Sequence, residues 1–223
     1  MKLNVKVLTT AIGGAAALAA YALFVRPWHL RWGATEEELE MSLPGDELVE
    51  HPRLNATRAI TISVPVEDVW PWLVQVGQKR GGFYSYTWLE NLVGCDMHNA
   101  NQIVPDWQDL KVGDEVWLHP KAPPLKVLAI EPGRAIVLEN SWTFCLLPVD
   151  DHTTRLIIRG CGQFNPDLKN ALLNLILWRG VLEPAHFIME RKMMLGIKQR
   201  AEANASSLKL NAQANDYEGM DSE

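Results

Sequence analysis

The pattern of apolar and polar residues changes along the chain, and each change predicts a different kind of structure. Residues 5–25 form an apolar stretch with one charged side chain, Lys6, at its edge. Across residues 58–64 apolar and polar side chains alternate, which is the period of a strand with one buried face. Across residues 185–201 apolar residues recur every three or four positions, as in an amphipathic helix. The pattern therefore predicts an apolar amino-terminal helix, a sheet and a long carboxy-terminal helix.

Further elements are expected between these segments. Residues 66–76 have apolar residues at helical spacing and acidic residues in the first turn, and Pro71 requires this helix to start late or to bend. A short helix over residues 87–92 is ended by Gly94. Five more strands are predicted at residues 115–119, 125–130, 135–138, 142–148 and 154–160. Because short turns join neighbouring strands, these must pair antiparallel.

The elements divide the chain into four parts. Residues 1–33 hold the apolar stretch and its flank, and residues 34–56 form a polar connector broken by Pro and Gly. Residues 57–201 form one globular domain, and the composition of residues 202–223 predicts a disordered tail. The predicted fold class is α+β, with an antiparallel sheet, a long terminal helix and one amino-terminal transmembrane helix.

The apolar stretch has the length of a membrane-spanning helix. At about 1.5 Å per residue it extends roughly 30 Å, the thickness of a bilayer core. Tryptophans at positions 28 and 32 follow it, where interfacial aromatic residues usually lie. The alternative is a cleavable signal peptide, because Ala20-Tyr21-Ala22 resembles a cleavage site, although the apolar run continues beyond this triplet. We expect a single-pass membrane protein, and the free-looking cysteines favour a cytoplasmic domain.

Composition and charge exclude several functional classes. With 223 residues, of which 48% are hydrophobic and 22% charged, the chain is globular in character. A net charge of -6 without a cluster of Lys and Arg argues against a nucleic-acid partner. Three cysteines at positions 95, 145 and 161 give neither a disulfide framework nor a zinc-binding spacing. We therefore expect no metal and no cofactor.

Residues 81–88, GGFYSYTW, concentrate aromatic side chains behind a glycine pair. One interpretation is that Phe83, Tyr84, Tyr86 and Trp88 line a pocket for an apolar molecule, with the tyrosine hydroxyls as its few polar contacts. The alternative is that these rings belong to the core, with their hydroxyls at the surface. In an extended run Phe83 would point away from the two tyrosines.

A polar cluster follows the aromatic segment. Asp96 and His98 have the residue types of an oriented general base, and Asn101 lies close behind them. Loop capping is the alternative, because Asp and Asn commonly bond to their own backbone in loops. The remaining candidates for ligand contact are Trp142 and Phe144, which share a strand face, and His186 at the start of the terminal helix.

Four runs carry a resemblance to a known family. They cover residues 57–75, 81–86, 104–114 and 128–134. These runs resemble the SRPBCC superfamily, also called START-like or helix-grip, and in particular its polyketide cyclase and dehydratase-like proteins. The resemblance spans residues 26–201. It implies a curved antiparallel sheet that grips the terminal helix, with a deep cavity for lipids, polyketides or other apolar ligands, and it carries no shared catalytic signature.

Three hypotheses for function follow. The leading one is a membrane-anchored protein that binds or transfers a small hydrophobic ligand, lipid-, polyketide- or isoprenoid-like, without covalent chemistry. The second is a cyclase or dehydratase-type enzyme in which Asp96, His98 and a tyrosine hydroxyl move protons on a carbonyl compound. The third is a non-catalytic module that presents its sheet to another protein. The expected partners are thus a small apolar ligand and a membrane.

Overall fold

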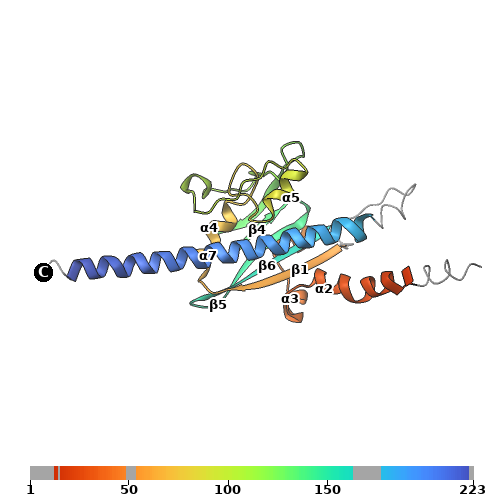
Figure 1. Cartoon of the computed structure of the whole chain (residues 1–223), viewed down its shortest axis with the longest axis horizontal. Coiled ribbons are helices and arrows are strands. Elements are labelled where there is room, and N and C mark those ends of the chain that lie inside the picture. The colour runs from red at the N-terminus through yellow and green to blue at the C-terminus, as the bar shows by residue number, and fades with distance from the viewer. Residues whose placement is uncertain (1–12, 15, 49–53, 163–176, 221–223) are drawn as a thin grey trace, which may run out of the picture.

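The computed structural model describes residues 13–14, 16–48, 54–162 and 177–220. Its centre is a six-stranded antiparallel sheet in the order β1-β6-β5-β4-β3-β2 (Figure 1). The strands are β1 (Leu54–Ile62), β2 (Glu115–Val116), β3 (Leu125–Glu131), β4 (Ala135–Leu138), β5 (Trp142–Asp150) and β6 (Thr153–Gly162). The predicted α+β class and antiparallel pairing are confirmed. β2 is shorter than expected, since the chain turns away around Pro120, which has no N–H for a ladder.

One face of the sheet is covered by helices. The long helix α7 (Glu183–Met220) lies across it, and α4 (Val66–Val74) packs on both α7 and the sheet (Figure 1). The core between them is fully buried and apolar, and it includes Ile62, Val69, Trp72, Leu146, Leu156, Ile158, Met193, Met194 and Ile197. The short helix α5 (Thr87–Leu92) has the predicted bounds. This is the arrangement that the resemblance to helix-grip proteins implied.

Two helices differ in extent from the prediction. α4 begins at Val66 as predicted but ends at Val74, before the predicted residue 76, and it keeps Pro71 inside, which excludes the late start of the two alternatives for this proline. The loss of one backbone bond at Pro71 is offset by the buried side chains of Trp72 and Leu73. α7 continues to Met220, where a disordered tail was predicted from residue 202. Residues 202–220 contain no proline, and their alanines, leucines and glutamates have good helix propensity, so the helix can continue without a core to bury.

The predicted connector packs against the other face of the sheet. It contains α3 (Glu36–Glu40), which starts with a capping box between Thr35 and Glu38. Glu38 pairs with Arg155 of β6 at 2.6 Å, and Asp46 pairs with Arg159 of the same strand at 2.6 Å. Both arginines point away from α7. The segment is therefore a second cover of the sheet rather than a free linker.

The described part of the amino-terminal segment lies beside the start of α7 (Figure 1). A π-helical turn (Tyr21–Val25) leads into α2 (Arg26–Leu30). The hydroxyl of Tyr21 donates a hydrogen bond to the carbonyl oxygen of Arg179 at 2.6 Å. Residues 5–12 and 15 of the predicted membrane span lie outside the described residues. Within the described ranges, no helix combines the length and the apolar character needed to cross a bilayer.

Candidate functional site

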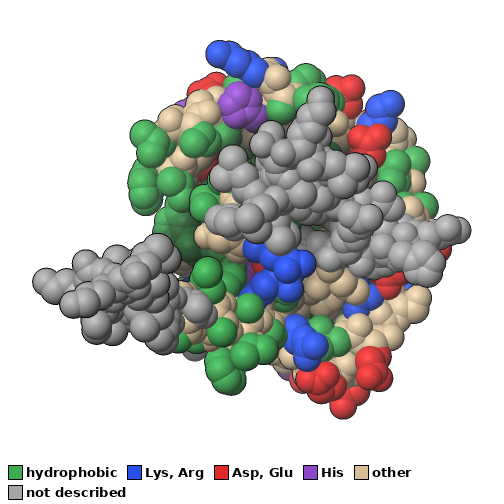
Figure 2. Space-filling view, turned by 90° about the vertical axis from the view of Figure 1, so that its right-hand side faces the viewer, with side chains coloured by type: hydrophobic (Ala, Val, Ile, Leu, Met, Phe, Trp, Pro, Cys, Tyr) green, Lys and Arg blue, Asp and Glu red, His purple; other side chains and the backbone are tan. Residues whose placement is uncertain are grey.

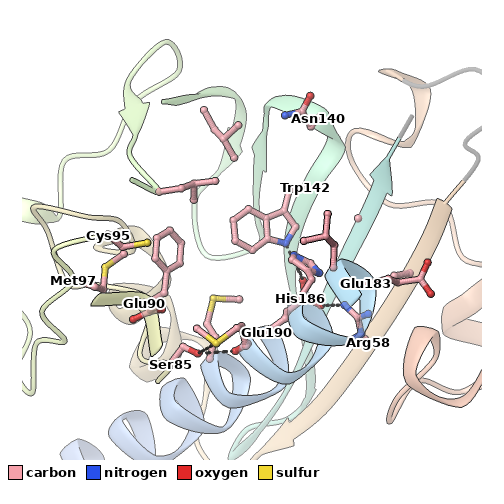
Figure 3. Close-up of a pocket in the computed structure, with 18 of the residues that line it drawn as sticks. Arg58, Ser85, Glu90, Cys95, Met97, Asn140, Trp142, Glu183, His186 and Glu190 are labelled. Atoms are coloured by element: carbon pink, nitrogen blue, oxygen red, sulfur yellow. Dashed lines mark hydrogen bonds and ion pairs between the residues drawn. The ribbon is translucent and has the colours of Figure 1, made fainter. Parts of the chain in front are cut away.

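A cavity of about 580 Å³ lies between α7, α5 and the sheet (Figure 3). Its lining is mostly apolar: Ala56, Phe83, Cys95, Met97, Leu118, Leu125, Trp142, Gly160, Trp178, Leu182, Met189 and Met193. The polar members of the lining are Arg58, Ser85, Glu90, Glu139, Asn140, Glu183, His186 and Glu190. A volume of this size suits a small organic molecule.

Strand register explains why space is left beside the sheet. Ala56 of β1 pairs with Gly160 of β6, and Gly160 pairs on its other side with Trp142 of β5. A Cβ atom added at Gly160 would meet no other atom within 4 Å. Two of these three neighbouring positions therefore contribute almost no side-chain volume, and the void opens next to the indole of Trp142.

The aromatic segment contributes one ring to this cavity. Phe83 lines it and stacks on Trp142, with ring centroids 6.0 Å apart. Ser85 lines it too, and its hydroxyl donates a hydrogen bond to the carbonyl oxygen of Met189 at 3.0 Å. Phe144 lies behind Trp142, 4.8 Å between centroids, and is buried in the core instead of lining the cavity.

The two tyrosines and Trp88 lie elsewhere. The hydroxyl of Tyr84 is in the core, where it donates to the carbonyl oxygen of Trp72 at 3.1 Å and accepts from Gln75 at 3.0 Å. Burial raises the pKa of Tyr84 to about 12, so its hydroxyl keeps its proton. Tyr86 lies under the ammonium of Lys192, and Trp88 is 69% exposed. Among the described lining of the cavity, none of these three rings appears.

The polar cluster that follows is a surface loop. His98 Nε2 lies 3.3 Å from Asp96 Oδ1, with side chains 82% and 74% exposed, and neither residue lines the cavity. Asn101 accepts a hydrogen bond from Arg200 at 2.9 Å. Asn99, between them, accepts from the backbone N–H of Tyr84 and donates to the carbonyl oxygen of Ser85. These contacts tie the loop to the aromatic segment 14 and 15 positions earlier in the chain.

One wall of the cavity contains a buried ion pair that the sequence analysis missed. Arg58 of β1 and Glu190 of α7 are joined at 2.5 Å. Trp142 Nε1 donates to the second oxygen of Glu190 at 3.2 Å, and His186 Nε2 lies 3.7 Å from that oxygen (Figure 3). His186 lines the cavity, and its side chain is 56% exposed. The sequence position of Arg58 could have indicated its burial, because in a strand it projects to the same face as Ile60 and Ile62.

The opposite side of the cavity carries Glu90 of α5. It lies with Cys95 and Met97, away from the Arg58 and Glu190 pair (Figure 3). Glu90 is 8% exposed, and burial raises the pKa of its carboxyl. Burial and the charge of Glu90 also raise the pKa of the Cys95 thiol. No sequence signal marked Glu90, because a glutamate in a short helix is ordinarily exposed.

The described residues contain no group of three His, Cys, Asp or Glu side chains placed to hold a metal ion. What the geometry offers is an apolar chamber with two polar ends, one ionic and one carrying a single carboxyl.

Comparison with known proteins finds similarity in solved structures. The crystal structure of protein MLL2253 from Mesorhizobium loti is 17% identical, covers 66% of this chain and 97% of that chain, and has a TM-score of 0.36. The solution structure of the Polyketide_cyc-like protein Cgl2372 from Corynebacterium glutamicum is 14% identical, covers 72% of this chain and 94% of that chain, and has a TM-score of 0.30. No family model and no curated protein sequence matches the chain.

Proposed function

We propose that the protein binds a small, largely apolar molecule in the cavity between α7 and the sheet. The observation that carries this proposal is the cavity of about 580 Å³ with its lining of aromatic, methionine and leucine side chains. Such a chamber is costly to leave unfilled, because its walls lose packing contacts, and a ligand of matching shape restores them. The few polar groups at its ends fix the orientation of the ligand.

Binding or transfer is favoured over cyclase or dehydratase chemistry. That alternative relied on Asp96, His98 and a tyrosine hydroxyl. The first two are exposed on a surface loop, and the hydroxyl of Tyr84 is engaged in the core. A general base must come within hydrogen-bond reach of the proton that it removes. Groups that do not line the chamber are poorly placed to do so.

We also propose that the amino-terminal segment holds this domain at a membrane. Hydrophobic side chains are exposed on this end of the molecule (Figure 2). The exposed apolar residues of the amino-terminal segment and of the turn before α7 include Leu18, Leu23, Phe24, Trp28, Val181 and Leu182. Leu182 also lines the cavity, so this surface continues into the chamber. We expect the full-length chain to sediment with membranes and to stay there after carbonate washing. Recovery in the soluble fraction would contradict this proposal.

The binding proposal is tested by filling the cavity. Gly160→Phe adds a ring where a side chain meets open space, whereas the matched control Val149→Phe adds a ring at an exposed position of β5. Full-length proteins are purified in mild detergent and extracted with solvent, and the extracts are compared by mass spectrometry. A compound retained by the native protein and by the control but absent from Gly160→Phe supports binding. In a parallel titration with the apolar dye N-phenyl-1-naphthylamine, equal affinity of all three proteins would contradict it.

A further inference from the structure

Glu90 is the carboxylate of the cavity lining that has no partner among the described residues. Its Oε2 atom is fully buried without a hydrogen bond, and no ion pair engages the side chain. The other acidic residues of the lining are engaged: Glu183 with Arg26 at 2.9 Å, Glu190 with Arg58, and Glu139 with the backbone N–H of Lys126. The Oε1 atom of Glu183 also lacks a hydrogen bond, but it is ion-paired with Arg26, whereas Glu90 has neither a hydrogen bond nor a cation in the part of the chain that the structure describes. Glu90 therefore has free hydrogen-bonding capacity in the chamber.

From this contrast we propose that Glu90 is a neutral hydrogen-bond donor to the ligand, and that the ligand is an uncharged apolar molecule with an acceptor oxygen such as a ketone or ester carbonyl. This inference rests on the proposed binding function and adds the chemical class of the ligand.

The environment decides the protonation of Glu90. An ionised carboxylate needs water, hydrogen-bond donors or a cation. Beside Glu90 lie Cys95, Met97 and Ser85 (Figure 3), and the Ser85 hydroxyl is already donated to the carbonyl oxygen of Met189. The basic side chains of the described lining, Arg58 and His186, are on the other side of the chamber, next to Glu190 (Figure 3). A protonated carboxyl has one O–H to donate. Rotation about its terminal torsion, which is broad for Glu, presents either oxygen to the chamber.

The arrangement also orients the ligand. Its acceptor oxygen meets Glu90 at the α5 side, and its apolar body lies between Phe83, Trp142 and the methionines of α7, Met189 and Met193. A hydrocarbon without the oxygen would fit the same space but would leave the carboxyl unpaired. The carboxyl therefore discriminates between ligands of equal shape, which an apolar wall does poorly.

A ligand with a positive charge is the competing occupant. An ammonium group could pair with an ionised Glu90, but both charges would then be removed from water in an apolar chamber. The variant Glu90→Gln distinguishes the two kinds of ligand. Gln keeps an N–H donor but carries no charge, so it supports a carbonyl ligand and not a cation.

The experiment compares three probes of nearly equal shape: 2-acetylnaphthalene, 2-ethylnaphthalene and 1-(2-naphthyl)ethylamine. Their affinities are measured by displacement of N-phenyl-1-naphthylamine from the full-length native protein, Glu90→Gln and Glu90→Leu. We expect the native protein and Glu90→Gln to prefer the ketone over the hydrocarbon by about threefold to tenfold, the contribution of one hydrogen bond. Glu90→Leu should bind the hydrocarbon at least as well and lose the preference.

The outcomes separate this inference from the binding proposal. Equal affinity of the native protein for ketone and hydrocarbon, or a ketone preference that survives in Glu90→Leu, overturns the role of Glu90 and leaves the cavity a binding site. Tightest binding of the amine, lost in both variants, overturns it in favour of a charged glutamate. Failure of the native protein to bind the dye and every probe overturns the proposed function and this inference together. Retained hydrocarbon binding by Glu90→Leu shows that the variant is folded.

Discussion

Arg58 of β1 donates a hydrogen bond to Glu190 of α7 at 2.5 Å, and the two side chains are 1% and 3% exposed. The two residues are 132 positions apart in the sequence, so this contact fixes the long helix to the edge strand of the sheet. It also forms one end of the cavity, where Trp142 shares the carboxylate. The pair is therefore both a tie between two elements and part of the site.

Breaking this pair from one side should be strongly destabilising. Arg58→Met leaves Glu190 buried without its cation, and we expect the free energy of unfolding to fall by about 3–5 kcal/mol. The double variant Arg58→Met, Glu190→Leu removes both charges and should lose clearly less than the sum of the single variants. Urea denaturation of the four proteins measures the coupling. Additive losses would show that the two side chains do not act as a unit.

Removing the carboxyl of Glu90 should stabilise the free protein. Its buried oxygen has no partner, so we expect Glu90→Leu to raise the free energy of unfolding by ~1–3 kcal/mol at pH 7, as measured by urea denaturation. The matched control Leu92→Ala changes an exposed residue of the same helix and should have a small effect. A loss of stability in Glu90→Leu of the size seen for core truncations would contradict the prediction.

The titration of the Glu90 carboxyl should also appear in the pH dependence of the free energy of unfolding. Burial raises the pKa of Glu90 above its ordinary value of 4.5, so the folded state holds this proton to higher pH than the unfolded state does. The contribution of this bound proton to the stability of the folded state is fully present below pH 4.5, and it is lost as the pH rises through the pKa of Glu90 in the folded state. The stability of the native protein relative to Glu90→Gln should therefore fall as the pH rises. A difference that is constant with pH would contradict the raised pKa.

The comparison with Glu90→Gln isolates that carboxyl from its neighbours. The other titratable and charged groups of the lining are Cys95 after α5, Arg58 of β1, Glu139 between β4 and β5, and Glu183, His186 and Glu190 of α7. All of them are present in both proteins, so their titration largely cancels in the difference. The measurement is the free energy of unfolding from urea denaturation at several pH values.

Gly196 of α7 marks a close approach of the helix to the aromatic segment. A Cβ atom at this position would lie 2.3 Å from the carbonyl oxygen of Tyr84, and Tyr84 itself has a φ of 54°. Gly196→Ala should lower the free energy of unfolding by about 2 kcal/mol, because the clash outweighs the better helix propensity of alanine. The control Gly180→Ala meets no atom within 4 Å and should be neutral or stabilising. Thermal denaturation distinguishes the two, and equal effects would contradict the contact.

His98→Ala should change neither stability nor ligand affinity appreciably. Its partner Asp96 is equally exposed, and ion pairs between exposed side chains contribute little. The measurement is dye displacement by 2-acetylnaphthalene together with a thermal melt. A tenfold or greater loss of affinity would bring this loop back as part of the site.

The local elements were predictable because their signals come from neighbouring residues. Alternation placed the start of β1 within a few residues, turn residues between short apolar runs placed β3, β4 and the start of β5, and Gly94 placed the end of α5. Lining residues were much less predictable. In GGFYSYTW the ring count indicated a wall of four aromatics, but Phe83 alone among them reaches the cavity, since Gly82 and Tyr84 have positive φ and turn the chain.

The periodicity of α7 was also misleading about its polar side. The amphipathic pattern of residues 185–201 leaves Glu190, Arg191 and Lys198 off the apolar face, yet Glu190 is buried against β1. The periodicity of a helix shows in which direction each side chain projects from the helix axis. It does not show whether another element of the fold covers that side of the helix. The connector shows the same limit, because Glu38 and Asp46 look solvent-facing until Arg155 and Arg159 are brought over them.

The sequence by itself determined the order of the elements, the antiparallel pairing and the long terminal helix, since these follow from the period of apolar residues and from short turns. The tertiary structure decided which residues form the chamber. Gly160 opens it, Arg58 and Glu190 close one end and Glu90 faces the other, and these residues come from segments far apart in the chain. Packing between distant segments determines burial, and burial determines which carboxyl is paired and which is left for a ligand.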